Sequence, residues 1–176
     1  MKRLLLHVCC APCSTHVIDV LSKEYDLTIF FYNPNVEPIN EYEQRLIAAE
    51  KYAEEKNIPI IIGDYDNIEW RSAVKGRGGD AEGGERCRIC FRYRLEKTAE
   101  LAKEENFDLF AATLSVSPYK NAGLINQIGK ELGKKYDIRF LESDFKKQNG
   151  YLNSIQLSRR HNLYRQHYCG CLFSKK

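Results

Sequence analysis

The chain has 176 residues, of which 43% are hydrophobic, so it can bury the core of one compact domain without cross-links. No apolar stretch approaches the roughly 20 residues that span a bilayer, and a core of this size does not need the disulfide framework of a small secreted protein. The net charge of +3 neither requires nor excludes a nucleic-acid partner. We therefore expect a cytoplasmic protein without membrane association, whose seven cysteines stay reduced and available for chemistry.

Hydrophobic periodicity in the first half of the chain predicts three strands and two helices. The apolar run that ends at Val8 is typical of a buried strand, and Pro12 or Ser14 is expected near the start of the helix that follows. Pro34 and Pro38 mark a loop. In chain order we expect a strand over 3–8, a helix over about 12–23, a strand over 27–32, a helix around 42–53 and a strand over 58–62.

The second half opens with five glycines between residues 76 and 84, which predict a mobile or specially shaped loop. Beyond it we expect a helix over about 88–105, a strand over 109–113, a helix over 119–135, a strand over 138–141 and a last helix over 152–166. Strands that alternate with helices predict a single α/β domain over 1–176, with three layers around a parallel sheet. In such a sheet, the loops at the carboxyl ends of the strands form the site.

The cysteines fall into three tight groups that are far apart in the sequence. The groups are Cys9, Cys10 and Cys13, then Cys87 and Cys90, and finally Cys169 and Cys171. Scattered structural thiols would not cluster in this way, so the pattern predicts a metal or redox site assembled from three segments. The first group directly follows the first predicted strand, at the carboxyl edge of the sheet.

Cys87 and Cys90 form a C-x-x-C at the start of a helix, where two thiolates can reach one metal and the helix dipole favours their negative charge. With thiolates of the first group, they provide the four ligands of a zinc ion or a [4Fe-4S] cluster, and composition does not choose between the two. Cys13, on the first predicted helix, is expected to be a bystander. Asp64, in a loop near the expected mouth of the site, is a weaker candidate ligand.

One glycine separates Cys169 from Cys171, which is short for two ligands of a tetrahedral ion. The spacing instead allows a strained, easily reduced disulfide, so we predict a redox role for this pair. Nearby basic residues could hold phosphates and tyrosines could stack on an unpaired base, although a solvated basic face explains the charges as well. The candidate stacking residues are Tyr119, Tyr151, Tyr164 and Tyr168.

Five motifs are spread along the chain from the first predicted strand to the C-terminus. They are LLLHVCCAPCS, EGGERCRICFRYRL, TLSVSPYKN, DFKKQNGY and LYRQHYCGCLFS. Together they resemble the QueH family of epoxyqueuosine reductases over essentially the whole chain. The resemblance implies reductive deoxygenation of epoxyqueuosine to queuosine at the wobble position of tRNA, the last step of queuosine biosynthesis.

The resemblance also implies a Rossmann-like fold similar to that of the nucleotide alpha hydrolase, or PP-loop, group. The first turn holds Cys-Cys-Ala-Pro-Cys in place of a glycine- and serine-rich phosphate loop, so ATP binding is not expected. No cobalamin is expected either. Residues about 64–90 would form a metal-binding loop, and residues about 167–176 a redox tail. The implied [4Fe-4S] ligands are Cys9, Cys10, Cys87 and Cys90, and the implied redox-active pair is Cys169 with Cys171.

Several alternatives stay open at this point. Adjacent side chains of a strand point to opposite faces, so Cys9 and Cys10 can bind one cluster only if the backbone turns sharply there. Otherwise Cys10 would pair with Cys13, and Cys9 would bind a separate metal. A second metal ion, such as iron, and an unidentified electron donor are further expectations. The rival function is a zinc-stabilised RNA-binding module without redox activity.

Overall fold

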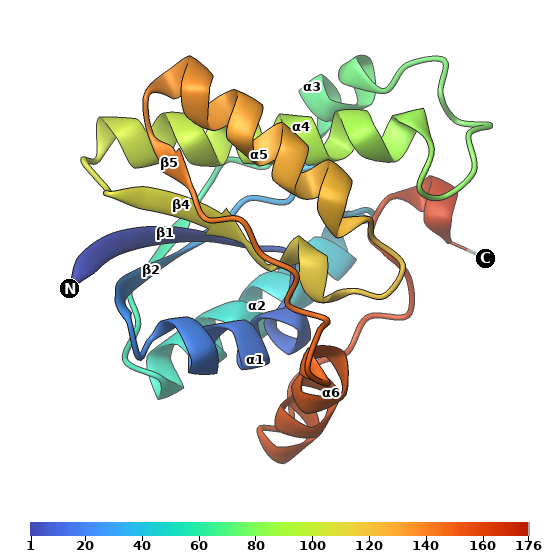
Figure 1. The fold of residues 1–176 in the computed structure, drawn as a ribbon. Coiled ribbons are helices and arrows are strands. Elements are labelled where there is room, and N and C mark those ends of the chain that lie inside the picture. Colours follow the sequence, from blue (N-terminus) through green and yellow to red (C-terminus); the bar gives the residue numbers. More distant parts are fainter. Residues whose placement is uncertain (176) are drawn as a thin grey trace.

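The computed structural model describes residues 1–175, which contain a five-stranded parallel sheet (Figure 1). The strand order is β3-β2-β1-β4-β5, and every neighbouring pair is parallel. The strands are β1 (Lys2–Val8), β2 (Tyr25–Phe31), β3 (Ile60–Ile62), β4 (Leu109–Ala112) and β5 (Arg139–Phe140). The predicted single parallel α/β sheet is thereby confirmed, and the five strands lie close to their expected positions.

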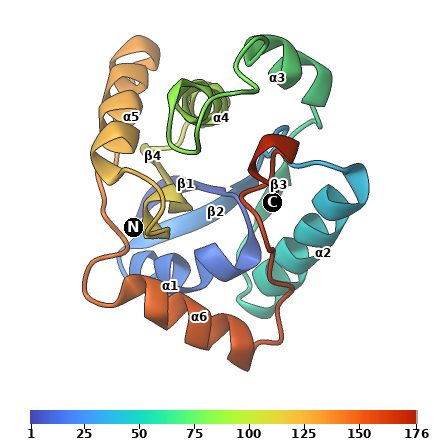
Figure 2. The ribbon, with the colours of Figure 1, turned by 90° about the vertical axis from the view of Figure 1, so that its right-hand side faces the viewer.

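Helices cover both faces of the sheet and give three layers (Figures 1 and 2). One face carries α1 (Ala11–Leu21), α2 (Ile39–Glu55) and α6 (Gly150–Arg160), and the other carries α4 (Glu85–Glu104) and α5 (Ala122–Tyr136), with α3 (Asn67–Ala73) beside α4. The central strand β1 is buried on both faces, because Leu4 and Leu6 pack toward α1 and α2 while Leu5 packs toward α4 and α5.

The structure differs from the sequence-based prediction in the segment over 64–90. Part of this expected metal-binding loop is helical, because α3 spans Asn67–Ala73 and α4 begins at Glu85. The remaining loop is held in shape by the buried side chain of Arg86, whose Nη1 donates to the backbone carbonyls of Arg77 and Asp80 at 3.1 and 2.6 Å. Cys87 and Cys90 lie on the first turns of α4, at the start of a helix as the C-x-x-C pattern predicted.

The last helix also ends earlier than predicted. α6 stops at Arg160, because Asn162 takes a left-handed backbone conformation (φ 50°) and Leu163 then turns into the core. Residues 161–175 form a tail that runs from α6 to the carboxyl edge of the sheet and ends in a short 3-10 helix, Leu172–Ser174, near α3 (Figure 2). Within residues 1–175, no helix is long and apolar enough to cross a membrane.

Candidate functional site

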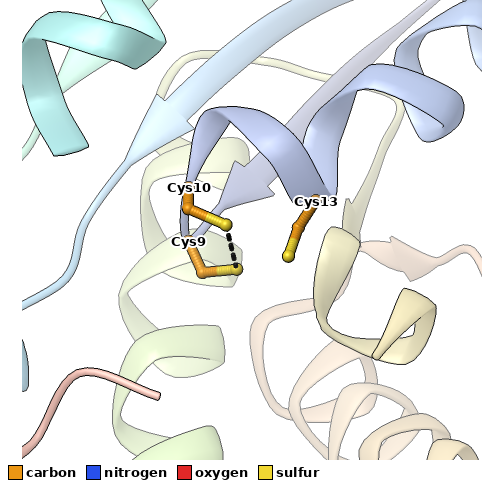
Figure 3. Close-up of side chains that lie close together, drawn as sticks. All are labelled: Cys9, Cys10 and Cys13. Atoms are coloured by element: carbon orange, nitrogen blue, oxygen red, sulfur yellow. Dashed lines mark hydrogen bonds between the residues drawn. The ribbon is translucent and has the colours of Figure 1, made fainter. Parts of the chain in front are cut away.

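The first cysteine group lies where β1 ends and α1 begins (Figure 3). Cys10 is the N-cap residue of α1 with an extended backbone (φ −165°, ψ 156°), and Pro12 lies in the first turn. This turn brings the sulfurs of Cys9 and Cys10 to 3.8 Å from each other. Cys13 lies in the first turn of the helix and points back, so that all three sulfurs are within 4.8 Å of one another. The structure thus supplies the sharp turn that the sequence required, and it places Cys13, the expected bystander, in the same group.

Hydrogen bonds and burial give these three thiols different pKa values. The thiols of Cys10 and Cys13 stabilise the Cys9 thiolate, which lowers the pKa of Cys9 well below its usual value. Burial raises the pKa of Cys10 to about 12, and the shared hydrogen bonds raise that of Cys13. Cys9 is therefore the thiol of this group that ionises most readily.

Two cations lie beside these sulfurs. Burial alone would lower the pKa of Arg94, but the neighbouring thiols of Cys90, Cys169 and Cys9 raise it. Arg94 is only 2% exposed, its Nη2 atom has no hydrogen-bond partner, and no carboxylate pairs with it among residues 1–175. The thiols likewise outweigh burial and raise the pKa of Lys120. A buried, unpaired cation is costly unless negative charge accompanies it, so the site suits a thiolate-bound group with net negative charge.

The second cysteine group lies on α4, across from the first. The backbone N–H of Gly83 donates to the sulfur of Cys87 at 3.2 Å, while Cys90 is buried next to Trp70 and Cys171. Burial raises the pKa values of both Cys87 and Cys90. Neither joins the three-sulfur group within 4.8 Å. Arg94 is common to both surroundings: its Nε donates to the carbonyl of Cys90 at 3.4 Å, and it lines the same cleft as Cys9 and Cys13.

The tail that carries the third group is anchored by a buried arginine. Arg45, whose side chain is 1% exposed, donates from Nε to Glu41 at 2.8 Å, and from its Nη atoms to the backbone carbonyls of Cys169 and Tyr168 at 2.8 and 3.0 Å. The hydroxyl of Tyr164 donates to the other oxygen of Glu41 at 2.6 Å. Cys169 is half-buried and Cys171 is buried against Cys90, so the C-terminal cysteines belong to an ordered segment.

A cleft of about 710 Å³ lies between the first cysteine group and the C-terminal tail. Cys9 and Cys13 of the first group and Cys169 of the third group line it, together with the cations Arg94 and Lys120. The four tyrosines considered as stacking residues all line it: Tyr119, Tyr151, Tyr164 and Tyr168. The cleft therefore joins thiol chemistry to an aromatic and basic wall at the carboxyl edge of the sheet.

Asp64 lies elsewhere. It is exposed just after β3 and lines a separate, shallower pocket with Tyr32 and Lys97. Among the described residues it is not near the cysteine groups that form the cleft.

Sequence reasoning did not single out three residues of the site, Arg94, Lys120 and Gln166. Arg94 lies within the motif RCRICFRYRL, Lys120 within SPYKN and Gln166 within YRQHYCGC. Their places in these motifs are the only feature of the sequence that points to them. Their roles depend on contacts between distant segments, such as the one between Gln166 and Cys10.

Solved structures with this fold include tRNA-modifying proteins. The U34-tRNA thiolase NcsA from Methanococcus maripaludis, solved with its [4Fe-4S] cluster, superposes with a TM-score of 0.62 at 15% identity, over 99% of this chain and 62% of that one. A predicted subunit of a tRNA methyltransferase from Methanocaldococcus jannaschii gives a TM-score of 0.58 at 14% identity, over 87% of this chain and 76% of that one. At these identities, the likeness establishes the fold alone.

Sequence relatives are much closer. An epoxyqueuosine reductase QueH from Streptococcus pyogenes is 42% identical over 98% of this chain and 70% of the relative. The corresponding protein from Staphylococcus aureus is 40% identical over 98% of this chain and 75% of its own. That from Thermotoga maritima is 38% identical over 99% of this chain and 91% of its own. The family model described as epoxyqueuosine reductase QueH matches residues 4–176, so this chain belongs to the QueH family.

Proposed function

We propose that the chain reduces epoxyqueuosine in tRNA to queuosine. In this reaction both carbon–oxygen bonds of the epoxide break, an alkene forms, and the oxygen leaves as water after uptake of two electrons and two protons. One structural observation carries the proposal: the sulfurs of Cys9, Cys10 and Cys13 gather within 4.8 Å at a cleft that Cys169 also lines. Family membership supplies the substrate class. A tRNA substrate would place the reaction in the cytoplasm.

The proposed cofactor is a [4Fe-4S] cluster. Cys9, Cys10, Cys87 and Cys90 would hold it, and it would supply electrons at low potential when bound. The buried and unpaired guanidinium of Arg94 supports this choice, because it provides the positive charge that a set of thiolates needs. A second metal ion, such as iron, would take Cys13 as a ligand.

Cys169 and Cys171 are the proposed redox-active pair. Cys171 is buried against Cys90, whereas Cys169 lines the cleft. This arrangement supports a relay in which the dithiol is oxidised to a disulfide as it delivers two electrons, and is then reduced by an external electron donor. Arg45 would hold the relay in place through the carbonyl of Cys169.

The walls of the cleft suit an unpaired nucleoside. Tyr119 is 78% exposed and could stack on a base, while Arg165 and Lys175 could contact phosphates. Lys120 lines the cleft with Cys9, Cys13 and Cys169 and could donate a hydrogen bond to the epoxide oxygen, where negative charge develops as the carbon–oxygen bonds break.

The test is conversion of a tRNA that carries epoxyqueuosine. The protein is purified anaerobically and supplied with a chemical reductant, and the nucleosides are then analysed by mass spectrometry for the loss of one oxygen atom. We expect queuosine with the wild-type chain, and repeated turnover to be lost with Cys169→Ser or Cys171→Ser. A wild-type protein that binds one zinc ion, holds tRNA and leaves the epoxide intact would refute the proposal and support a zinc-stabilised RNA-binding module.

A further inference from the structure

Gln166 links the C-terminal tail to the first cysteine group. Its Nε2 atom donates a hydrogen bond to the sulfur of Cys10 at 2.9 Å and lies 3.8 Å from the sulfur of Cys13. The two partners of the shorter bond are 156 residues apart in the sequence. A side-chain amide thus reaches from the segment of the proposed dithiol to a proposed metal-binding thiolate.

This contact is not what anchors the tail. Arg45 binds the tail through the carbonyls of Tyr168 and Cys169, and Tyr164 binds Glu41. By contrast, the side chain of Gln166 makes hydrogen bonds only to sulfur, since its Oε1 atom is buried and has no partner among residues 1–175. Leaving Oε1 unpaired has a free-energy cost, so the contact with sulfur must offset it.

The orientation of the amide also suits a thiolate. A thiolate offers only lone pairs, so Nε2 and not Oε1 must face it. An N–H donor beside a metal-bound sulfur withdraws electron density from that sulfur, which stabilises the more negative, reduced state of the metal group. It also fixes the direction from which the sulfur approaches the metal.

We infer that Gln166 is a positioning residue for Cys10, which orients this thiolate and raises the reduction potential of the metal group that it holds. The inference rests on the proposed function, because it requires a redox-active group at Cys10. It also gives the tail a second role beyond carrying the dithiol: the tail contributes a hydrogen bond to the metal site. The potential of that site would then depend on whether the tail is docked.

The experiment compares Gln166→Leu and Gln166→Glu with a matched control, Gln156→Leu, whose glutamine is exposed on α6. Midpoint potentials are measured by anaerobic redox titration followed in the visible spectrum, and release of iron to a chelator is timed. We expect a lower potential and about 10-fold faster iron release for Gln166→Leu, since loss of a group that orients a ligand typically weakens metal binding by this factor. Gln166→Glu should lower the potential further, because it adds negative charge. The control should match the wild type.

Two outcomes would overturn the inference. If both Gln166 variants keep the wild-type potential and iron-release rate, Gln166 has no role at the metal, while the proposed function stands. If the wild-type chain itself binds no iron, the inference and the proposed function fail together. Should Gln166→Leu lose its cooperative thermal unfolding, Gln166→Met decides the question, because it keeps the length of the side chain, adds no charge and removes the N–H donor.

Discussion

Replacing Arg45 with alanine should release the C-terminal tail and destabilise the whole fold. Arg45 makes one ion pair with Glu41, at 2.8 Å, and two hydrogen bonds to carbonyls of the tail, at 2.8 and 3.0 Å. Its side chain is 1% exposed, and that of Glu41 is 11% exposed. Solvent therefore screens these interactions weakly, and the alanine variant leaves a nearly buried carboxylate without its cation and two carbonyls of the tail without their donor.

The size of the effect follows from these contacts. Breaking a buried ion pair by removing one partner typically costs about 3–5 kcal/mol. In a chain of this length, each kcal/mol lowers the melting temperature by about 2–4 °C, so we expect a fall on the order of 10 °C for Arg45→Ala. Arg92→Ala is the matched control, because the Arg92–Glu131 pair is 40% and 44% exposed and should contribute less than about 1 kcal/mol.

Thermal unfolding and amide hydrogen exchange measure the two consequences separately. Exchange should accelerate more in residues 164–171 of Arg45→Ala than in β1, because the tail loses its anchor in addition to the stability that the whole fold loses. A variant that unfolds within about 2 °C of the wild type and keeps slow exchange over 164–171 would refute the reasoning that Arg45 holds the proposed dithiol in place.

Three other predictions concern pH, packing and catalysis. Burial raises the pKa of Glu41, but hydrogen bonds from neighbouring tyrosine and arginine side chains outweigh burial and hold the pKa below its usual value. The ionised carboxylate therefore stabilises the folded state above about pH 4.3, and this stabilisation is lost as the pH falls through the lowered pKa. Acid unfolding curves of Glu41→Gln should lack this loss. A methyl group at buried Gly129 would overlap the ring of Phe140, so Gly129→Ala should cost about 1–3 kcal/mol by denaturant titration. Gly79→Ala, with no atom within 4 Å of the added methyl, should cost much less. Lys120→Met should bind its metal normally and lower the rate of epoxide reduction by about 100-fold; a wild-type rate would exclude Lys120 from the reaction.

The sequence predicted the sheet well because the strands are short apolar runs between recognisable helices. It missed α3, whose seven residues bury little beyond Trp70 and leave no clear periodic pattern. It also extended α6 to residue 166, since nothing in the hydrophobic pattern shows that Asn162 takes a left-handed conformation.

The site was predicted only in part, because the positions of some of its side chains depend on contacts between segments that are far apart in the sequence. The sequence indicated which cysteines cluster along the chain and that the backbone must turn at Cys9 and Cys10. It did not reveal that Cys13 points back to them, because this depends on α1 beginning at Ala11, directly after its cap at Cys10. The position of Arg94, bonded to the carbonyl of Cys90 and lining the cleft with Cys9, likewise depends on how α4 packs on the sheet.

The central claim is that thiolates from the end of β1 and the start of α4 hold one iron–sulfur cluster. Iron and acid-labile sulfide should be determined in the anaerobically purified protein, together with Cys87→Ser and Cys90→Ser. We predict a brown wild-type protein with broad visible absorption and about four irons per chain, and loss of the cluster in both variants. A colourless wild-type protein with one zinc ion, or variants that keep all of their iron, would contradict the claim.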